Sequence, residues 1–203
     1  MVSLTIHITG QEKEAMPSMI ISDSVPAPYF NLTEREVKQC LPELESYLDR
    51  SYHTVAGSDY VVASAFPGFH DIYKEAGVGS SYGYLDSNDG ETFEFTFQKA
   101  LESNPDVIQV VTWNDYGEGT MVEPTLETGY KYLEIIQKIK IESIDSKFPF
   151  KPEDLKLPIQ IYNLRKQYTG NIKVNVHLDE AVLAILAERP DLAREIIAQY
   201  PSK

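Results

Sequence analysis

Two carboxylates, Asp115 and Glu118, lie three residues apart in a polar segment that also contains Trp113, the only tryptophan of the chain. The Tyr116-Gly117 pair between them lets both carboxylates point into one pocket. Two carboxylates beside an aromatic ring are the groups that cleave glycosidic bonds, because one acid donates a proton while the ring stacks on the sugar. Asp and Glu in glycine-containing loops are also common as solvated turn residues. The pattern therefore predicts a glycosidase-like site, with an ordinary surface loop as the alternative.

Two apolar runs must position these side chains. Residues 107–111 precede the carboxylate loop and have the Val and Ile content of a buried strand. Residues 60–65 form a second such run, which leads into a Pro-Gly-aromatic loop at 66–71. In (β/α) barrels, catalytic residues lie at the carboxyl ends of the strands, where the loops vary while the barrel holds them in place. We therefore expect Phe69, His70 and the carboxylate loop at one edge of a sheet.

The run at 112–125, Thr-Trp-Asn-Asp-Tyr-Gly-Glu-Gly-Thr-Met-Val-Glu-Pro-Thr, resembles the signature of glycoside hydrolase families 71 and 99. Both families are (β/α)8 barrels. The Trp-Asn-Asp-Tyr-Gly-Glu core is similar to family 71, which cleaves α-1,3-glucan. The continuation Glu-Gly-Thr-x-Val-Glu-Pro is similar to family 99, which acts internally on α-mannosides and also has a Pro-Gly-Tyr motif similar to Pro67-Gly68-Phe69. The resemblance covers roughly residues 58 to 140.

The resemblance implies a role for each matching residue. Glu118 corresponds to the general acid/base, and Asp115 to the carboxylate that assists the substrate 2-hydroxyl, which is Glu in family 99 and Asp in family 71. Phe69 replaces the family 99 Tyr and so lacks a hydroxyl near the chemistry. The candidate substrate-binding residues are Trp113, Asn114, Tyr116, Phe69, His70 and Glu123, and the alternative for Trp113 is a core residue. The implied activity is hydrolysis of an α-linked polysaccharide, an α-glucan or an α-mannan. The alternative is a non-catalytic remnant that binds carbohydrate or assembles with another chain.

The chain has 203 residues, whereas a (β/α)8 barrel typically needs about 250. We therefore predict an α/β fold: a partial or truncated TIM (β/α) barrel with a C-terminal helical extension. The expected boundaries are 1–142 for the barrel part, 143–156 for a proline-containing linker and 157–203 for the helical extension. The expected strands, all parallel, lie at residues 4–8, 19–22, 59–65 and 107–112.

An open parallel sheet has two edges with unpaired backbone groups, which proteins cover or pair. We expect these edges to be capped by the C-terminal helices, by a second copy of the chain or by a partner chain that supplies the other half of the barrel. Helical periodicity predicts a helix after the capping box of Thr33 and Glu36, and further helices at 91–103, 126–141, 157–168, 178–188 and 190–199.

The long segment at 70–90 is rich in Gly, Ser, Tyr and Asp, which is typical of a binding loop. Its residues Tyr73, Tyr82 and Tyr84 are candidates for stacking on sugar rings, with packing anchors as the alternative. The pair His70-Asp71 at the start of this segment is also a candidate to contact a substrate, with a hydrogen-bonded structural histidine as the alternative.

Composition excludes several other classes of function. The net charge of −13, from 31 acidic and 18 basic residues, disfavours nucleic acid and anionic membranes as partners but suits a neutral carbohydrate. The four His residues are scattered and Cys40 is the only cysteine, so the sequence predicts no metal site, disulfide or cofactor. The chain shows no transmembrane run and no signal peptide, which predicts a cytoplasmic location as it stands, and a periplasmic or secreted one if an upstream part precedes it.

Overall fold

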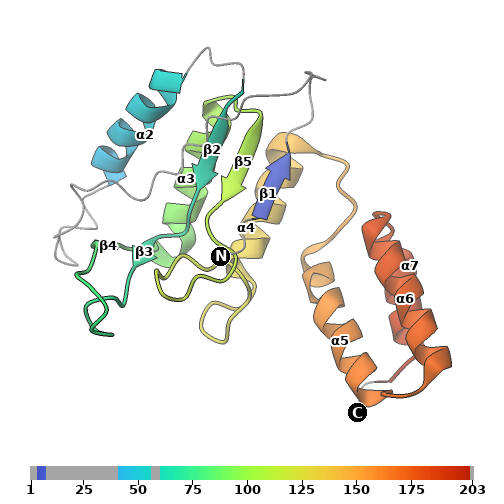
Figure 1. Cartoon of the computed structure of the whole chain (residues 1–203). Coiled ribbons are helices and arrows are strands. Elements are labelled where there is room, and N and C mark those ends of the chain that lie inside the picture. The colour runs from blue at the N-terminus through green and yellow to red at the C-terminus, as the bar shows by residue number, and fades with distance from the viewer. Residues whose placement is uncertain (1–3, 8–40, 56–59, 202–203) are drawn as a thin grey trace. The chain divides into compact units, whose positions relative to one another are not determined.

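The computed structural model describes residues 4–7, 41–55 and 60–201. The chain forms two compact units, Met1–Ile135 and Ile136–Lys203, and the division falls inside helix α4 (Lys131–Ile139). The predicted strand at 19–22, the capping box of Thr33 and Glu36, and Cys40 lie outside the described residues. The fold is a mixed α/β one (Figure 1).

The first unit contains a three-stranded sheet in the order β1-β5-β2, formed by β1 (Leu4–His7), β5 (Val107–Val110) and β2 (Val62–Ala65). Strands β2 and β5 are parallel, as predicted, with Val62 opposite Val107 and Ala65 opposite Val110. Strand β1 lies antiparallel to β5, with Leu4 opposite Val110. The expectation that all strands run parallel is therefore wrong for β1. Alternating apolar residues determine which face of a strand is buried, but they do not encode the direction of pairing.

Helix α3 (Glu91–Glu102) connects β2 to β5 and packs against the sheet, which confirms the helix predicted at 91–103. Its buried stripe consists of Thr92, Phe93, Thr96, Phe97 and Ala100. The buried Thr96 hydroxyl accepts a hydrogen bond from the Phe66 amide at 3.1 Å and donates one to the Phe66 carbonyl at 2.8 Å. This contact fixes the end of β2, where the chain turns toward the Pro-Gly-aromatic loop.

Helix α2 (Leu41–Val55) packs beside α3 in the same unit. The Lys99 ammonium of α3 forms ion pairs with Glu45 at 2.8 Å and Asp49 at 3.1 Å, both on α2. Two short antiparallel strands, β3 (Phe69–His70) and β4 (Tyr84–Leu85), form a second sheet. The 3-10 turn η2 (Asn88–Gly90) then leads into α3.

Helix α4 begins five residues later than the predicted helix at 126–141. The hydroxyl of Thr125 accepts hydrogen bonds from the amides of Glu127 at 3.2 Å and Thr128 at 3.0 Å, and Gly129 has φ +58°. These residues therefore form a turn, because hydroxyl-to-amide bonds of this kind compete with the helical pattern. After α4, the chain continues through a π-helical turn, η3 (Lys140–Ile144).

The second unit consists of the 3-10 turn η4 (Pro152–Lys156) and the helices α5 (Leu157–Gln167), α6 (Ile172–Leu186) and α7 (Pro190–Ala198). Its largest buried cluster contains Ile161, Leu164, Leu178, Ala181 and Ile196. Helix α6 starts six residues before its predicted start at 178. The side chain of Asn171 caps this start by accepting a hydrogen bond from the Val174 amide at 3.2 Å, which stabilises a first turn rich in β-branched residues.

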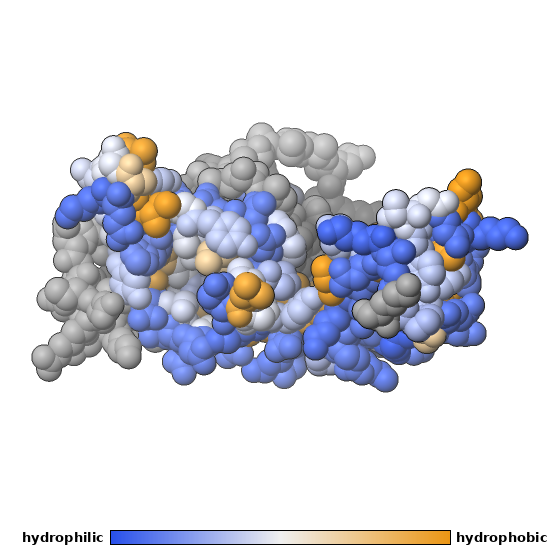
Figure 2. All heavy atoms as spheres, turned by 90° about the horizontal axis from the view of Figure 1, so that it is seen from below, coloured by the Kyte–Doolittle hydropathy of each residue, from blue (hydrophilic) through white to orange (hydrophobic). Residues whose placement is uncertain are grey.

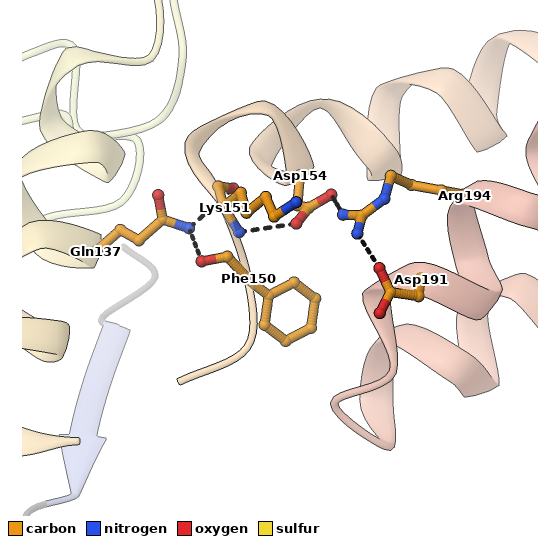
Figure 3. Close-up of polar contacts among 6 residues, drawn as sticks. All are labelled: Gln137, Phe150, Lys151, Asp154, Asp191 and Arg194. Atoms are coloured by element: carbon orange, nitrogen blue, oxygen red, sulfur yellow. Dashed lines mark hydrogen bonds and ion pairs between the residues drawn. The ribbon is translucent and has the colours of Figure 1, made fainter. Parts of the chain in front are cut away.

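A polar network holds the segment before α5 in place (Figure 3). The carboxylate of Asp154 is completely buried, accepts a hydrogen bond from the Lys151 amide at 2.8 Å and forms an ion pair with Arg194 of α7. Arg194 also pairs with Asp191, and the Gln137 amide group donates to the carbonyls of Phe150 and Lys151 at 3.3 and 3.1 Å. Part of the predicted linker at 143–156 is therefore ordered by specific hydrogen bonds.

On the face shown in Figure 2, hydrophilic side chains predominate and apolar ones form small separate spots. Within residues 4–7, 41–55 and 60–201, no helix is long and apolar enough to span a bilayer.

Candidate functional site

The two loops predicted to form the site are joined through their backbones. The His70 amide donates to the Glu118 carbonyl at 2.8 Å, and the Ile72 amide to the Gly117 carbonyl at 3.0 Å. Strands β2 and β5 are parallel, so the loops that follow them leave the same edge of the sheet. Gly119 adopts φ +65°, and a Cβ atom there would lie 2.9 Å from the His70 carbonyl oxygen. Glycine is therefore required for this close approach.

Two buried threonines close the base of the carboxylate loop. The Thr112 and Thr120 hydroxyls share a hydrogen bond of 2.8 Å, and the Thr112 amide donates to the Thr120 carbonyl at 2.9 Å. The Thr112 hydroxyl also accepts a hydrogen bond from the Asp115 amide at 3.1 Å. The loop is thus held at both ends, which limits the positions available to the carboxylates between them.

Tyr73 brings a hydroxyl to the candidate acid Glu118. Its Oη donates to Oε1 of Glu118 at 2.8 Å. The pKa of Tyr73 rises from 10.0 to about 12, first because of this hydrogen bond, then because of burial and the negative charges of Glu118, Asp115 and Asp71. The charges of three carboxylates therefore raise the pKa of the Tyr73 phenol, and both candidate acids are among them.

Asp71 shapes the loop that carries Tyr73. Its buried carboxylate accepts hydrogen bonds from the Tyr73 amide at 3.1 Å, the Ser81 hydroxyl at 3.0 Å and the Tyr82 amide at 2.6 Å. The rings of Tyr73 and Tyr82 meet edge to face, with 5.6 Å between their centroids. Asp71 thus ties the two ends of the segment 71–82 together and holds Tyr73 beside Glu118.

Asp115 participates in the turn that presents Glu118. Its Oδ1 accepts a hydrogen bond from the Glu118 amide at 3.1 Å, and both side chains are half-buried. A carboxylate that bonds the amide three residues ahead stabilises a tight turn. That the two acids face one sugar-binding cleft stays a prediction, but they share one turn, and the charges of both raise the pKa of Tyr73.

The remaining predicted residues of this edge differ in exposure. Phe69 is only 6% exposed and belongs to an apolar cluster with Leu44, Leu48, Phe66 and Leu85, so its ring is part of the core. His70 is exposed, and its ring meets Tyr84 edge to face at 5.0 Å. Trp113 is half-buried, and its carbonyl accepts hydrogen bonds from the amides of Val122 and Glu123.

Tyr116 and Glu123 form a second phenol–carboxylate pair on the carboxylate loop. The Tyr116 hydroxyl donates to Oε1 of Glu123 at 2.7 Å, and this bond raises the pKa of Tyr116. Tyr116 and Asn114 are exposed. The structure thus places Tyr73, Asp115 and Glu118 together, Tyr116 with Glu123, and Phe69 in the core.

The role of the Tyr73 hydroxyl was not predicted, although the ring of Tyr73 was a candidate for stacking on a sugar. The available signal was the spacing of Asp71 and Tyr73, because Asp often accepts a hydrogen bond from the amide two residues ahead. The same spacing predicts a turn that projects the tyrosine. Within the described part of the chain, no group of three or more His, Cys, Asp or Glu side chains is placed to hold a metal ion.

The sequence matches no protein-family model, and a search of curated proteins found no match. Among solved structures, the chain is similar to two structures of the GH99 endo-α-mannosidase from Bacteroides thetaiotaomicron, one of them in complex with Bis-Tris propane. Both show a TM-score of 0.33 and 18% identity over 55% of this chain. The match covers 38% and 36% of those chains, so this chain spans little more than a third of their length. Family 99 is one of the two families that the carboxylate motif resembles.

Proposed function

We propose that the loop of Asp115 and Glu118 is the acid/base site of a glycoside hydrolase of the family 71 and 99 type, acting on an α-linked glucan or mannan. The observation that carries this proposal is the cluster around Tyr73. Its hydroxyl bonds Glu118, and the charges of Asp115 and Glu118 both contribute to its raised pKa. A pair of acids held on one turn beside an aromatic ring suits glycoside cleavage.

In this proposal, Glu118 protonates the glycosidic oxygen as the bond to the leaving sugar breaks, and a water molecule then adds its hydroxyl to the anomeric carbon and returns a proton to Glu118. The Tyr73 hydroxyl occupies Oε1 of Glu118, so the other carboxylate oxygen is the one that meets the substrate. Asp115 is the second carboxylate of the site, and it assists the 2-hydroxyl of the sugar. General acid–base assistance of this kind contributes about 10² to 10⁴ in rate.

The sugar would bind over the exposed parts of the carboxylate loop. Tyr116 and Asn114 are exposed and Trp113 is half-buried beside them, which provides both a ring face and hydrogen-bonding groups. Glu123 would orient the Tyr116 ring through its hydrogen bond of 2.7 Å. His70 is the exposed polar group of the neighbouring loop.

For the fold, we propose that the unit β2-α3-β5 is one repeat of a (β/α) barrel. Two parallel strands joined by a helix, with the site loops at their carboxyl ends, are the repeating arrangement of such barrels. A second copy or a partner chain would supply further walls of the sugar site, because positioning of the substrate accounts for several kcal/mol of catalysis.

The alternative function is carbohydrate binding without hydrolysis. Two observations favour it. Oδ1 of Asp115 is already engaged by the Glu118 amide at 3.1 Å, as in an ordinary turn. In addition, β1 is antiparallel, so only β2 and β5 deliver loops to this edge within the described sheet.

The decisive experiment is Glu118→Gln, measured on the purified chain with α-glucans and α-mannans. If the chain hydrolyses one of them, the variant should lose about 10² to 10⁴ in rate, because the amide cannot donate the proton. Glu127→Gln, an exposed change in the same segment, is the matched control and should retain full activity.

Sugar binding is followed in parallel through the fluorescence of Trp113, the only tryptophan. Binding that is the same in the wild type and in Glu118→Gln, without hydrolysis by either, would support the binding alternative. Absence of both binding and hydrolysis would contradict both functions.

A further inference from the structure

Helix α6 carries apolar side chains on two opposite faces. Its inner face contributes Leu178, Ala181 and Ala184 to the core of the second unit. Its outer face consists of Ile172, Val176, Leu183 and Leu186, which are 78%, 53%, 63% and 75% exposed. A surface helix normally has one apolar stripe, so a second stripe indicates a second packing partner.

The outer face has the spacing of a helix-pairing seam. Together with Asp179, its residues lie at positions 172, 176, 179, 183 and 186, which are separated by alternating steps of four and three. This is the heptad pattern that brings two helices together along one line. Asp179 occupies the middle of the seam, and Arg165 of α5 pairs with it at 2.5 Å. The central charge is therefore neutralised from within the same unit.

Charges along α6 favour an antiparallel partner of the same kind. Lys173 stands near its beginning and Glu180 lies in its second half, whereas Glu188 and Arg189 just beyond the helix offset each other. A parallel pair of such helices would place like charges and like helix ends together. An antiparallel pair would bring Lys173 of one copy near Glu180 of the other. The face is thus complementary to itself.

We propose that the outer face of α6 is a homodimer interface in which two copies of the chain pack antiparallel. The two-fold axis passes between Val176 and Asp179, so Ile172 of one helix lies against Leu183 of the other, and Lys173 lies beside Glu180. Such an isologous contact uses the same patch on both copies. Helix α6 is only about 22 Å long, from 15 residues at a rise of 1.5 Å. The contact between two such helices buries little surface, so the dimer is reversible and concentration-dependent.

The first test is sedimentation velocity on the full chain over a range of concentrations. The wild type should shift from monomer to dimer as the concentration rises. Leu183→Asp should weaken the dimer at least about tenfold, because it places a charge in the apolar seam. Leu126→Asp, the same change at a fully exposed leucine of the first unit, is the matched control and should leave the dimer unchanged. Circular dichroism verifies that each variant keeps its helices.

A charge reversal tests the antiparallel direction. Lys173→Glu and Glu180→Lys should each weaken the dimer, and the double variant should restore it, because the two charges of each cross-copy pair are simply exchanged. Failure of the double variant to restore association would overturn the antiparallel arrangement.

Two other results would overturn the interface itself. One is a wild type that remains monomeric at every concentration. Hydrogen exchange over residues 172–186 would then show whether another part of the same chain covers the outer face of α6. The other is a dimer that withstands Leu183→Asp, which would place the interface elsewhere.

Discussion

Asp71 in the first unit and Asp154 in the second are both buried, but the two units satisfy them differently. Asp154 pairs with the guanidinium of Arg194 and accepts one backbone amide. The partners of Asp71 are neutral: the amides of Tyr73 and Tyr82 and the hydroxyl of Ser81. In the helical unit, a cation compensates the buried charge. Beside the candidate site, the charge is held by neutral donors and its field extends to Tyr73, whose pKa it helps to raise.

This difference indicates that the networks of Asp71 and Asp154 have different roles. The network of Asp154 joins the segment before α5 to α7, which is a structural task. The network of Asp71 orders an irregular loop and leaves negative charge near Glu118, which suits a site that handles protons. Changes at Asp71 should therefore affect ligand binding, and changes at Asp154 should affect stability alone.

The largest effect is expected for Asp71→Asn. The amide nitrogen that replaces Oδ2 cannot accept the hydrogen bonds of Ser81 and Tyr82, which should destabilise the first unit by about 2–3 kcal/mol. Sugar affinity should fall with it, because Tyr73 is no longer held beside Glu118. Urea unfolding followed by Trp113 fluorescence measures the first effect, and a sugar titration the second. An unchanged unfolding midpoint would show that Asp71 does not order the loop.

For Asp154→Asn, we expect a smaller loss of about 1–2 kcal/mol, because Arg194 is partly exposed and water replaces part of the lost pairing. Far-ultraviolet circular dichroism during urea unfolding should show the change, while sugar binding stays the same. Asp191→Asn is the matched control: this carboxylate bonds the same Arg194 but is 93% exposed, so its removal should have almost no effect. A loss of sugar binding in Asp154→Asn would remove the contrast between the two networks.

Gly119 and Gly129 permit a finer comparison within the first unit. Both have positive φ, +65° and +58°, but only at Gly119 would a Cβ meet backbone, 2.9 Å from the His70 carbonyl oxygen. Each substitution by Ala incurs the left-handed backbone cost of about 1 kcal/mol. Gly119→Ala should lose roughly a further 1 kcal/mol, because the loops of β2 and β5 must separate. Equal unfolding midpoints for the two variants would mean that these loops are not in contact in solution.

The smallest effect is the titration of Tyr73. Its folded pKa of about 12 exceeds the ordinary 10.0, so the protonated phenol is favoured in the folded state. The resulting stability is complete below about pH 10 and is lost as the pH rises toward 12. The difference in tyrosine absorbance between wild type and Tyr73→Phe should contain one group that titrates near 12. A component near 10 would show that the bond to Glu118 is not formed.

Much of the first unit was predictable because its signals are local. The Val and Ile run before the carboxylate loop predicts β5, and the apolar stripe of Phe93, Phe97 and Ala100 predicts α3. The start of α6 was predicted six residues late, since β-branched residues weaken the helical signal and the start is stabilised by the cap at Asn171. The role assigned to Phe69 at the site edge depended on its position in the motif alone, whereas its ring lies in the core.

Local sequence patterns are enough to predict the strands β2 and β5, the helix between them and the carboxylate loop, because hydrophobic periodicity and glycine positions act over a few residues. Three features depend on the packing of distant segments: the antiparallel direction of β1, the fit of Gly119 against His70, and the bond from Tyr73 to Glu118, which are 45 residues apart. Contacts between residues that distant in the chain depend on how whole elements pack, and no local pattern of residues encodes that choice.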